Sequence, residues 1–160
     1  MITRPARPAD LPGFLALAAE VEHWFGPMVD DPGFRRAVVR NIDRGRATVV
    51  DGPDGGLLGG LLVGGPPVGG APSVHHLHWL AVAERARGAG VGRALVEDVL
   101  RRRVRVRPAT VEVVTFGADH PGAVVSGARV FWERLGFTPA EAAEPGPEGG
   151  SRQVYRLHLA

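Results

Sequence analysis

The sequence contains no cysteine, no lysine and no long apolar run. The lack of cysteine excludes disulfide bonds, thiolate metal ligands and a cysteine nucleophile. No run reaches the roughly 18 apolar residues of a membrane span, and the N-terminal "MITRPARPAD" lacks the apolar centre of a signal peptide. We therefore expect a cytoplasmic protein with no membrane partner.

All 19 basic residues are arginine, and the many alanine, glycine, proline and valine residues point to a GC-rich bacterial coding sequence. The arginine excess is therefore weak evidence for a function, and a net charge of +2 is too small to predict nucleic-acid binding. The densest basic stretch is "RRRVRVR", residues 101–107. Its simpler interpretation is a solvated helix C-terminus, which cations stabilise; the alternative is contact with an anionic ligand or partner.

A chain of 160 residues, 44% of them apolar, suits one compact domain over residues 1–160. Hydrophobic periodicity and turn residues predict the order β-α-α-β-β-β-α-β-α-β-β. The helices are expected at residues 9–22, 32–43, 91–103 and 126–135. The strands are expected at residues 1–4, 46–52, 56–65, 73–82, 110–116, from 137, and 151–159. This order predicts an α/β protein with a mixed sheet, because the regular alternation of a doubly wound fold is missing.

Two connecting segments and one helix start are also predicted. Residues 64–72 read as a flexible loop rich in glycine and proline, and residues 141–150 as a surface turn. Asp31 precedes Pro32, which predicts an N-cap followed by proline in the first helical turn.

The stretch "ERARGAGVGRALVEDVL", residues 84–100, places three glycines between a strand and a helix. The dinucleotide pattern G-x-G-x-x-G fails at Arg93, and the P-loop pattern fails because there is no lysine. A glycine-rich turn at a helix N-terminus still offers free N–H groups and a positive dipole end to an anion. Taken alone, the loop fits a phosphate site and a ligand-free turn equally well.

A second motif, "GARVFWERLGF" at residues 127–137, adds to the first. Together they resemble the GNAT superfamily of N-acetyltransferases, in which R-x-x-G-x-G follows a strand ending in L-x-V and a later helix carries A-x-x-F-Y-E-x-x-G-F. Residues 80–92, "LAVAERARGAGVG", correspond to the first pattern, and the second is matched at Ala128, Phe131, Glu133, Gly136 and Phe137. The resemblance implies a mixed central sheet of six to seven strands flanked by about four helices.

The resemblance also implies acetyl-CoA as co-substrate and a primary amine as acceptor. The loop would bind the pyrophosphate, and the preceding strand edge would pair with the pantetheine arm. The N–H of Val82 would stabilise the oxyanion formed at the thioester carbonyl. The cofactor-binding residues implied in this way are Leu80, Ala81, Val82, Arg87, Gly88, Ala89, Gly90, Val91, Gly92, Arg93, Ser126, Phe131 and Trp132.

Trp132 departs from the family pattern, since a tyrosine that protonates the leaving thiolate often stands there. An indole N–H donates a hydrogen bond but is no practical proton source. Trp132 belongs either to the core or to the wall of the thiol pocket, and Ser126 is either a nearby hydroxyl or a helix N-cap. The departure does not exclude activity, because a thiol of pKa near 8.5 leaves as thiolate at pH 7 for about 2 kcal/mol.

The family also commonly carries a glutamate base on its fourth strand, where this chain has "HHLHW". In a regular strand His76 and His78 share a face with Leu80 and Val82, and a bulge would shift that parity. Histidine titrates near 6.5, which suits a base, so either residue is a catalytic candidate, with a structural role as the alternative. No metal site is expected, because alternation separates adjacent histidines.

The segment "EVEHWFGPMVDDPG", residues 20–33, is the acceptor wall by resemblance. Trp24, Phe25 and Met28 form an apolar set there, which either binds substrate or caps the core. The acceptor is a small-molecule or peptide amine, the acyl group is acetyl or longer, and a homodimer is compatible with the sequence. A rival function is a CoA-binding regulatory or interaction module without robust catalysis, suggested by the missing tyrosine and glutamate.

Overall fold

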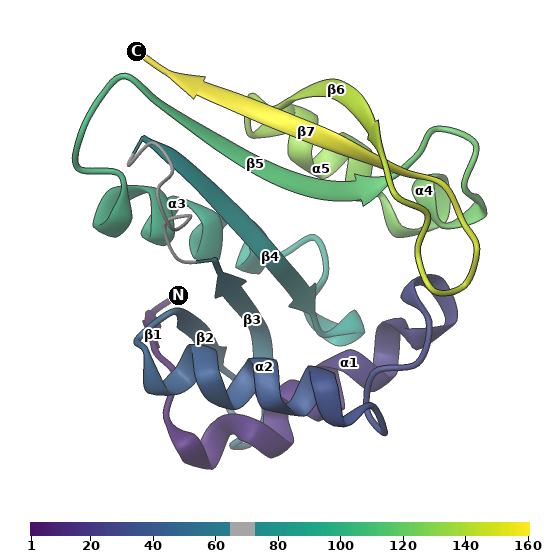
Figure 1. The fold of residues 1–160 in the computed structure, drawn as a ribbon. Helices are drawn as coiled ribbons and strands as arrows, with labels where there is room; N and C mark the ends of the chain where they lie inside the picture. Colours follow the sequence, from purple (N-terminus) through teal and green to yellow (C-terminus); the bar gives the residue numbers. More distant parts are fainter. Residues whose placement is uncertain (65–72) are drawn as a thin grey trace.

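The computed structural model describes residues 1–64 and 73–160, in which seven strands form one mixed sheet (Figure 1). They are β1 (Thr3–Pro5), β2 (Ala47–Asp51), β3 (Leu57–Val63), β4 (Val74–Val82), β5 (Ala109–Phe116), β6 (Thr138–Ala143) and β7 (Arg152–Leu159). The order across the sheet is β1-β2-β3-β4-β5-β7-β6, and the pair β4–β5 is parallel while the other described pairs are antiparallel. The predicted mixed sheet is confirmed. The predicted loop at 64–72 lies outside the described residues except for Gly64.

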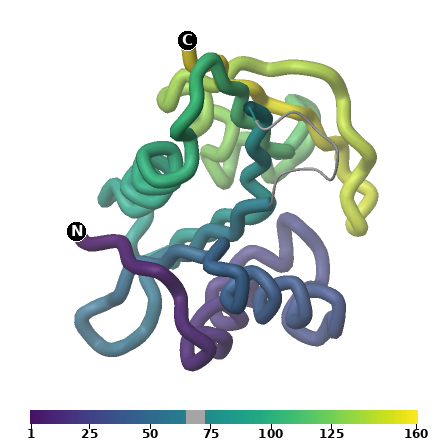
Figure 2. The backbone as a smooth tube through the Cα atoms, turned by 60° about the vertical axis from the view of Figure 1, so that its left-hand side comes forward, coloured from purple at the N-terminus to yellow at the C-terminus, as the bar shows by residue number. Residues whose placement is uncertain are grey.

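Helices cover both faces of this sheet. Within the described ranges they are α1 (Leu11–Phe25), α2 (Pro32–Asp43), α3 (Val91–Arg103), α4 (Pro121–Ser126) and α5 (Ala128–Arg134), with short 3-10 turns η1 (Pro8–Asp10) and η2 (Glu84–Ala86). Helices α1 and α2 lie on one side of the sheet and α3 on the other (Figure 2). None of the described helices is long and apolar enough to cross a membrane.

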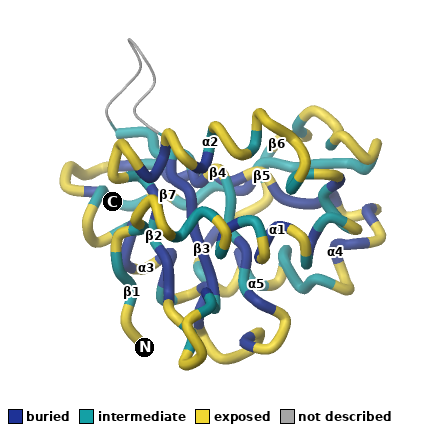
Figure 3. The backbone as a smooth tube through the Cα atoms, turned by 90° about the horizontal axis from the view of Figure 1, so that it is seen from below, coloured by how far each residue is buried: buried dark blue, intermediate teal, exposed yellow. Residues whose placement is uncertain are grey.

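The inner strand β3 is buried along most of its length (Figure 3). Leu61 packs into the core beneath α3, and its neighbour Leu62 packs into the core beneath α1 and α2. Gly59 and Gly60, which precede Leu61 in β3, are glycines for a steric reason. A Cβ at Gly59 would come within 2.6 Å of Val91 in α3, and one at Gly60 within 2.7 Å of Phe14 in α1. Glycine therefore lets both helices pack close to this strand.

The helix boundaries agree with the sequence in part. Helix α2 starts as predicted, with the Asp31 carboxylate accepting the Gly33 N–H at 2.9 Å. Helix α1 continues through Phe25 instead of ending at Glu22, and it stops at Gly26, whose φ is 92°. Two predictions are corrected further along. The short helix α4 was not predicted, and residues 141–143 belong to β6 rather than to the surface turn.

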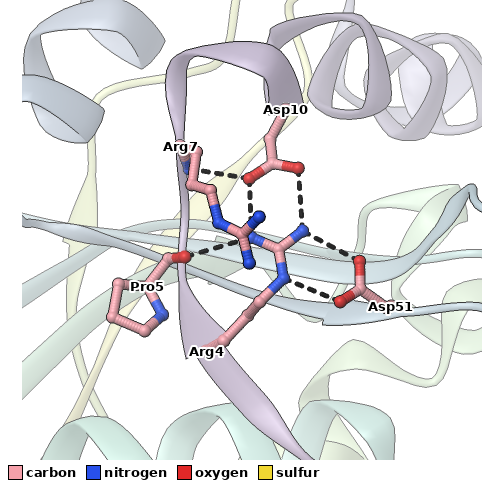
Figure 4. A network of polar contacts seen from close by, with 5 residues as sticks. All are labelled: Arg4, Pro5, Arg7, Asp10 and Asp51. Atoms are coloured by element: carbon pink, nitrogen blue, oxygen red, sulfur yellow. Dashed lines mark hydrogen bonds and ion pairs between the residues drawn. The ribbon is translucent and has the colours of Figure 1, made fainter.

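An arginine at the N-terminus ties β1 to its surroundings (Figure 4). The Arg4 guanidinium donates to the Asp51 carboxylate on β2 at 2.7 and 2.8 Å, and to the Asp10 carboxylate in η1 at 2.9 Å. Asp10 also accepts the Arg7 backbone N–H at 2.7 Å. Hydrogen bonds from Arg4 hold the pKa of both carboxyls below their usual range. This network fixes the short edge strand, which has few contacts of its own.

We expect Arg4→Gln to lower the free energy of unfolding by about 1–2 kcal/mol at pH 7, since two carboxylates lose a bidentate partner. A carboxyl whose folded pKa is depressed stabilises the fold above its unfolded pKa, near 4, and loses that effect as pH falls further. The difference between the proteins should therefore shrink at pH 3 in urea unfolding. Arg7→Gln, which keeps the backbone donor, serves as control; an equal loss at both pH values would contradict the assignment.

Candidate active site

The parallel strands β4 and β5 part at one end of the sheet. They pair only from Val74 to Leu77 against Thr110 to Val113, whereas β5 continues to pair with β7 as far as Phe116. Beyond that point the two strands diverge (Figure 1). A cavity of about 960 Å³ is lined by the far part of β4, the end of β5 and the helices beside them.

The edge of β4 that faces this opening carries free backbone groups. Gly59 lies opposite Val82 and Leu61 opposite Leu80, and the Ala83 N–H donates to the Leu58 carbonyl at 2.8 Å. Hydrogen-bonded and non-bonded pairs alternate in an antiparallel ladder. Leu80 and Val82 therefore direct their N–H groups away from β3, toward the side that β5 has left. This geometry fits an extended ligand pairing with β4, and it fits an N–H donor at Val82.

The glycine-rich loop forms a backbone cradle at the start of α3. Gly90 is the N-cap in a left-handed conformation with φ of 87°, and no side chain caps the helix there. The first-turn N–H groups of Val91, Gly92 and Arg93 have no acceptors within the helix. A Cβ built at Gly88 or Gly90 would meet no atom within 4 Å, so the loop backbone faces open space. The cradle therefore has the donors, the dipole and the access that a pyrophosphate requires.

Arg87 links this cradle to the opposite wall. Its Nε donates to the Val82 carbonyl at 3.4 Å, and its guanidinium carbon lies 5.0 Å from the centre of the Trp24 ring at the end of α1. Arg93 instead points along α3 and pairs with Glu97 at 3.3 Å. Arg87 is thus the loop arginine that lies between the end of β4 and the Trp24 ring of α1.

The structure places nearly all of the predicted site residues around this one cavity. Those that line it are Trp24, Phe25, Met28, His78, Leu80, Ala81, Val82, Arg87, Gly88, Gly90, Val91, Gly92, Arg93, Ser126, Phe131 and Trp132. Two predicted residues are not part of its lining: His76, and Ala89, whose N–H bonds to the Ala86 carbonyl at 3.3 Å within the turn.

A bulge in β4 separates the histidines from the residues predicted to share their face. Val63 of β3 lies opposite Leu77 and Leu62 opposite Trp79, so His78 is an extra residue. Leu77 consequently packs into the same core as Leu80 and Val82. The regular-strand expectation that His76 and His78 share the face of Leu80 and Val82 is wrong, and the bulge that was the stated alternative is present.

The bulge leaves His78 at the cavity and His76 beside it. The two rings are 6.4 Å apart, but the His76 Nδ1 lies 3.7 Å from the Glu112 carboxylate, which also pairs with Arg156. The pKa of His78 is lowered, first by partial withdrawal from water and then by the charges of His76 and Arg40. A lowered pKa keeps the His78 imidazole neutral at physiological pH, which a proton acceptor requires.

His75 lies on the other face of the sheet. It lines a separate cavity of about 460 Å³ together with Arg102 and Arg103 of α3. Burial lowers its pKa first, and the neighbouring Arg103 charge adds to this. The three histidines of "HHLHW" therefore have three different surroundings.

Trp132 belongs both to the core and to the cavity wall. It is 4% exposed and makes edge-to-face contacts with Phe131 and Phe137, with ring centres 4.8 and 5.2 Å apart. Ser126 is not the N-cap of α5, because Gly127 takes that position with φ of 68°. Its hydroxyl nevertheless accepts the Ala128 N–H at 3.2 Å and donates to the Gly122 carbonyl. Trp132 therefore belongs to the core and borders the cavity, whereas the predicted N-cap at Ser126 is wrong.

The predicted acceptor wall at the end of α1 contacts a residue that sequence reasoning missed. Arg152, at the start of β7, lies over the stacked rings of Phe25 and Phe116 at 5.0 and 5.5 Å. Its guanidinium pairs with Glu148 at 2.8 Å, and Glu148 also contacts His120 at 3.3 Å. No local pattern marks Arg152, because only the β6–β7 turn brings it to α1.

Phe34 and Trp79 also line the cavity and were not predicted. Phe34 is in the first turn of α2, and Trp79 follows the bulge in β4. The apolar residues next to Trp79 in the sequence predict a strand, but they do not predict which face of the sheet the Trp79 side chain occupies.

Comparisons with known proteins agree with this geometry. The family model of the acetyltransferase (GNAT) domain matches residues 44–139. The chain belongs to the GNAT acetyltransferase family. No curated protein matches the sequence of this GNAT protein.

Several solved structures share its fold. An N-acetyltransferase from Staphylococcus aureus Mu50 is 16% identical with a TM-score of 0.76, and the match covers 99% of this chain and 98% of that one. A ribosomal-protein-alanine N-acetyltransferase from Brucella melitensis is 20% identical, with a TM-score of 0.71 and coverage of 99% and 100%. A chain of the NatC complex bound to Gag peptide and CoA is 15% identical, with a TM-score of 0.74 and coverage of 99% and 98%. At these identities the likeness shows the GNAT fold.

If the cradle binds the pyrophosphate, a negative charge placed in it should weaken CoA binding. Two variants of nearly equal shape isolate this effect of charge. Asparagine and aspartate both tolerate a left-handed φ, so Gly90→Asn and Gly90→Asp should strain the loop equally. The aspartate places a negative charge beside the proposed pyrophosphate, and we expect it to raise the Kd for CoA at least about tenfold over the asparagine variant in calorimetry. Equal affinity of the two variants would place the pyrophosphate elsewhere.

Proposed function

We propose that this GNAT protein transfers an acetyl group from acetyl-CoA to a primary amine by direct attack of the amine on the thioester. One observation carries the proposal: a single cavity joins the free edge of β4 and the α3 cradle to a separate aromatic wall. The first two features suit the donor, and the wall suits an acceptor. The NatC relative, whose structure contains CoA, supports the donor.

The donor half would be held mainly by backbone. The N–H groups at the start of α3 would bind the pyrophosphate, with Arg87 adding positive charge beside it. The free groups of Leu80 and Val82 would pair with the pantetheine arm as an added strand. The bound thioester supplies an activated carbonyl carbon, and the Val82 N–H would stabilise negative charge on its oxygen.

The transfer requires one bond to form, one to break and one proton to leave the amine. The amine nitrogen bonds to the carbonyl carbon, the carbon–sulfur bond breaks, and CoA departs as thiolate before taking a proton from water. We assign the removal of the amine proton to His78, which borders the cavity and has a lowered pKa. His76 would influence the rate only through its neighbour, because Glu112 holds it outside the cavity.

The pH profile tests this role for His78. Because its pKa lies below the ordinary 6.5, the neutral base should persist until the pH falls below that value. The acidic limb of kcat/KM should therefore lie under pH 6.5 in the wild type. We expect His78→Gln to lower kcat about 100-fold and to remove this limb.

His75→Gln provides the control for that measurement, since His75 lies on the opposite face of the sheet. It should leave kcat and the profile unchanged. A His78→Gln enzyme with the wild-type rate and limb would show that another group, or water, accepts the proton.

Free-thiol release across a panel of primary amines tests the reaction itself. Release that depends on both the amine and the protein supports the transferase. The rival function is a CoA-binding module without robust catalysis, and it predicts CoA binding in calorimetry without amine-dependent thiol release. A faster rate with a longer acyl-CoA would keep the reaction and change the donor.

A further inference from the structure

Four aromatic rings from α1, α2 and β4 line the cavity: Trp24, Phe25, Phe34 and Trp79. Trp79 packs against Phe34 of α2, with ring centres 5.6 Å apart, and against Phe14 of the core at 6.0 Å. Trp24 and Phe25 line the cavity at the end of α1. These rings come from three separate elements. Packing holds Phe25, Phe34 and Trp79, and Trp24 lies against Arg87.

Specific contacts hold the end of α1, which carries Trp24 and Phe25, in place. Phe25 stacks on Phe116 of β5 at 4.5 Å, and the Arg152 guanidinium covers both rings. Gly26 follows with a positive φ, and a Cβ there would lie 3.0 Å from Pro147 of the β6–β7 turn. The end of α1 is thus held between β5 and that turn.

The charges around the cavity are unequal. Among the described lining residues, Asp31 is the one carboxylate, whereas Arg87, Arg93, Arg134 and Arg152 are cationic. Asp31 already accepts the Gly33 N–H at 2.9 Å as the N-cap of α2. Arg93 and Arg152 are paired with Glu97 and Glu148, so the shortage of carboxylates carries the argument. A ligand with several ammonium groups would find one carboxylate among the described lining residues.

We propose that the acceptor is a primary amine on an aromatic body with a single cationic centre. An aromatic body replaces water against Phe34, Trp79 and Trp24, where ring contacts add to apolar burial. A single ammonium matches the single carboxylate. On the same ground, polyamines and aminoglycosides should bind more weakly than an amine with one charge. The reaction of this acceptor rests on the proposed function, but its recognition does not.

Binding to the CoA-saturated protein tests recognition without catalysis. In calorimetry with CoA present, 2-phenylethylamine should bind at least about tenfold more tightly than spermidine or ethylamine. Ethylamine carries the same single charge without the ring, and spermidine carries additional charges without the ring. Spermidine binding as tightly as 2-phenylethylamine would overturn the proposal, and so would equal binding of ethylamine.

A matched pair of variants on α2 tests the wall. Phe34→Leu keeps an apolar side chain but removes the ring, and it should weaken 2-phenylethylamine binding about three- to tenfold. Val39→Ala changes a 41% exposed residue of the same helix and should leave that affinity unchanged. Both variants should bind CoA as the wild type does. A Phe34→Leu protein that keeps full affinity for the amine would contradict the aromatic wall.

Thiol release with the same amines separates the two proposals. Binding of 2-phenylethylamine without turnover would refute the transferase and leave the recognition in place. Turnover of spermidine at a higher kcat/KM than 2-phenylethylamine would support the transferase and refute the aromatic acceptor.

Discussion

The separation of β4 from β5 is the constraint on which the rest of the structure depends. A sheet normally satisfies the backbone groups of its inner strands on both sides, and here the one parallel pair in the described sheet stops at Leu77 and Val113. The N–H groups beyond that point face the cavity, where water or a ligand can accept their hydrogen bonds. The β4 bulge and the glycine cradle lie at the same end of the sheet, so the opening, the bulge and the anion site form one local arrangement.

The two halves of the cavity use different physical means. The proposed donor half consists of backbone: a helix N-terminus, glycine turns and a strand edge, which would position a ligand without side-chain specificity. The proposed acceptor half consists of side chains from α1, α2 and β4, and the Phe25–Phe116 stack and Arg152 hold its α1 end. Arg87 contacts both halves, because it bonds to the Val82 carbonyl and covers Trp24. Backbone recognition also explains why the donor half was the easier one to find in the sequence.

Local patterns predicted what local physics decides. The Asp31 cap, the start of α3 at Val91 and the glycine loop each depend on a few adjacent residues, and all three agree with the structure. The side of the sheet that His78 occupies depends on a bulge in β4 against β3. No residue type in β4 predicts the position of that bulge. Arg152 reaches the acceptor wall through a pairing with β6 and a turn. Such placements depend on contacts between distant segments, which the sequence pattern does not specify.

Trp132, which stands where the family often has a tyrosine, is consistent with these separate roles of backbone and side chains. An indole in the tight cluster with Phe131 and Phe137 gives the cavity a rigid apolar wall and would offer no proton source to a departing thiolate. Departure of a thiolate at pH 7 costs only about 2 kcal/mol relative to the thiol, because its pKa lies near 8.5. Deprotonating an ammonium of pKa near 10.4 is the larger demand, about 4–5 kcal/mol at the same pH. In the proposed reaction, the neutral His78 at the cavity would therefore serve the costlier of the two proton transfers.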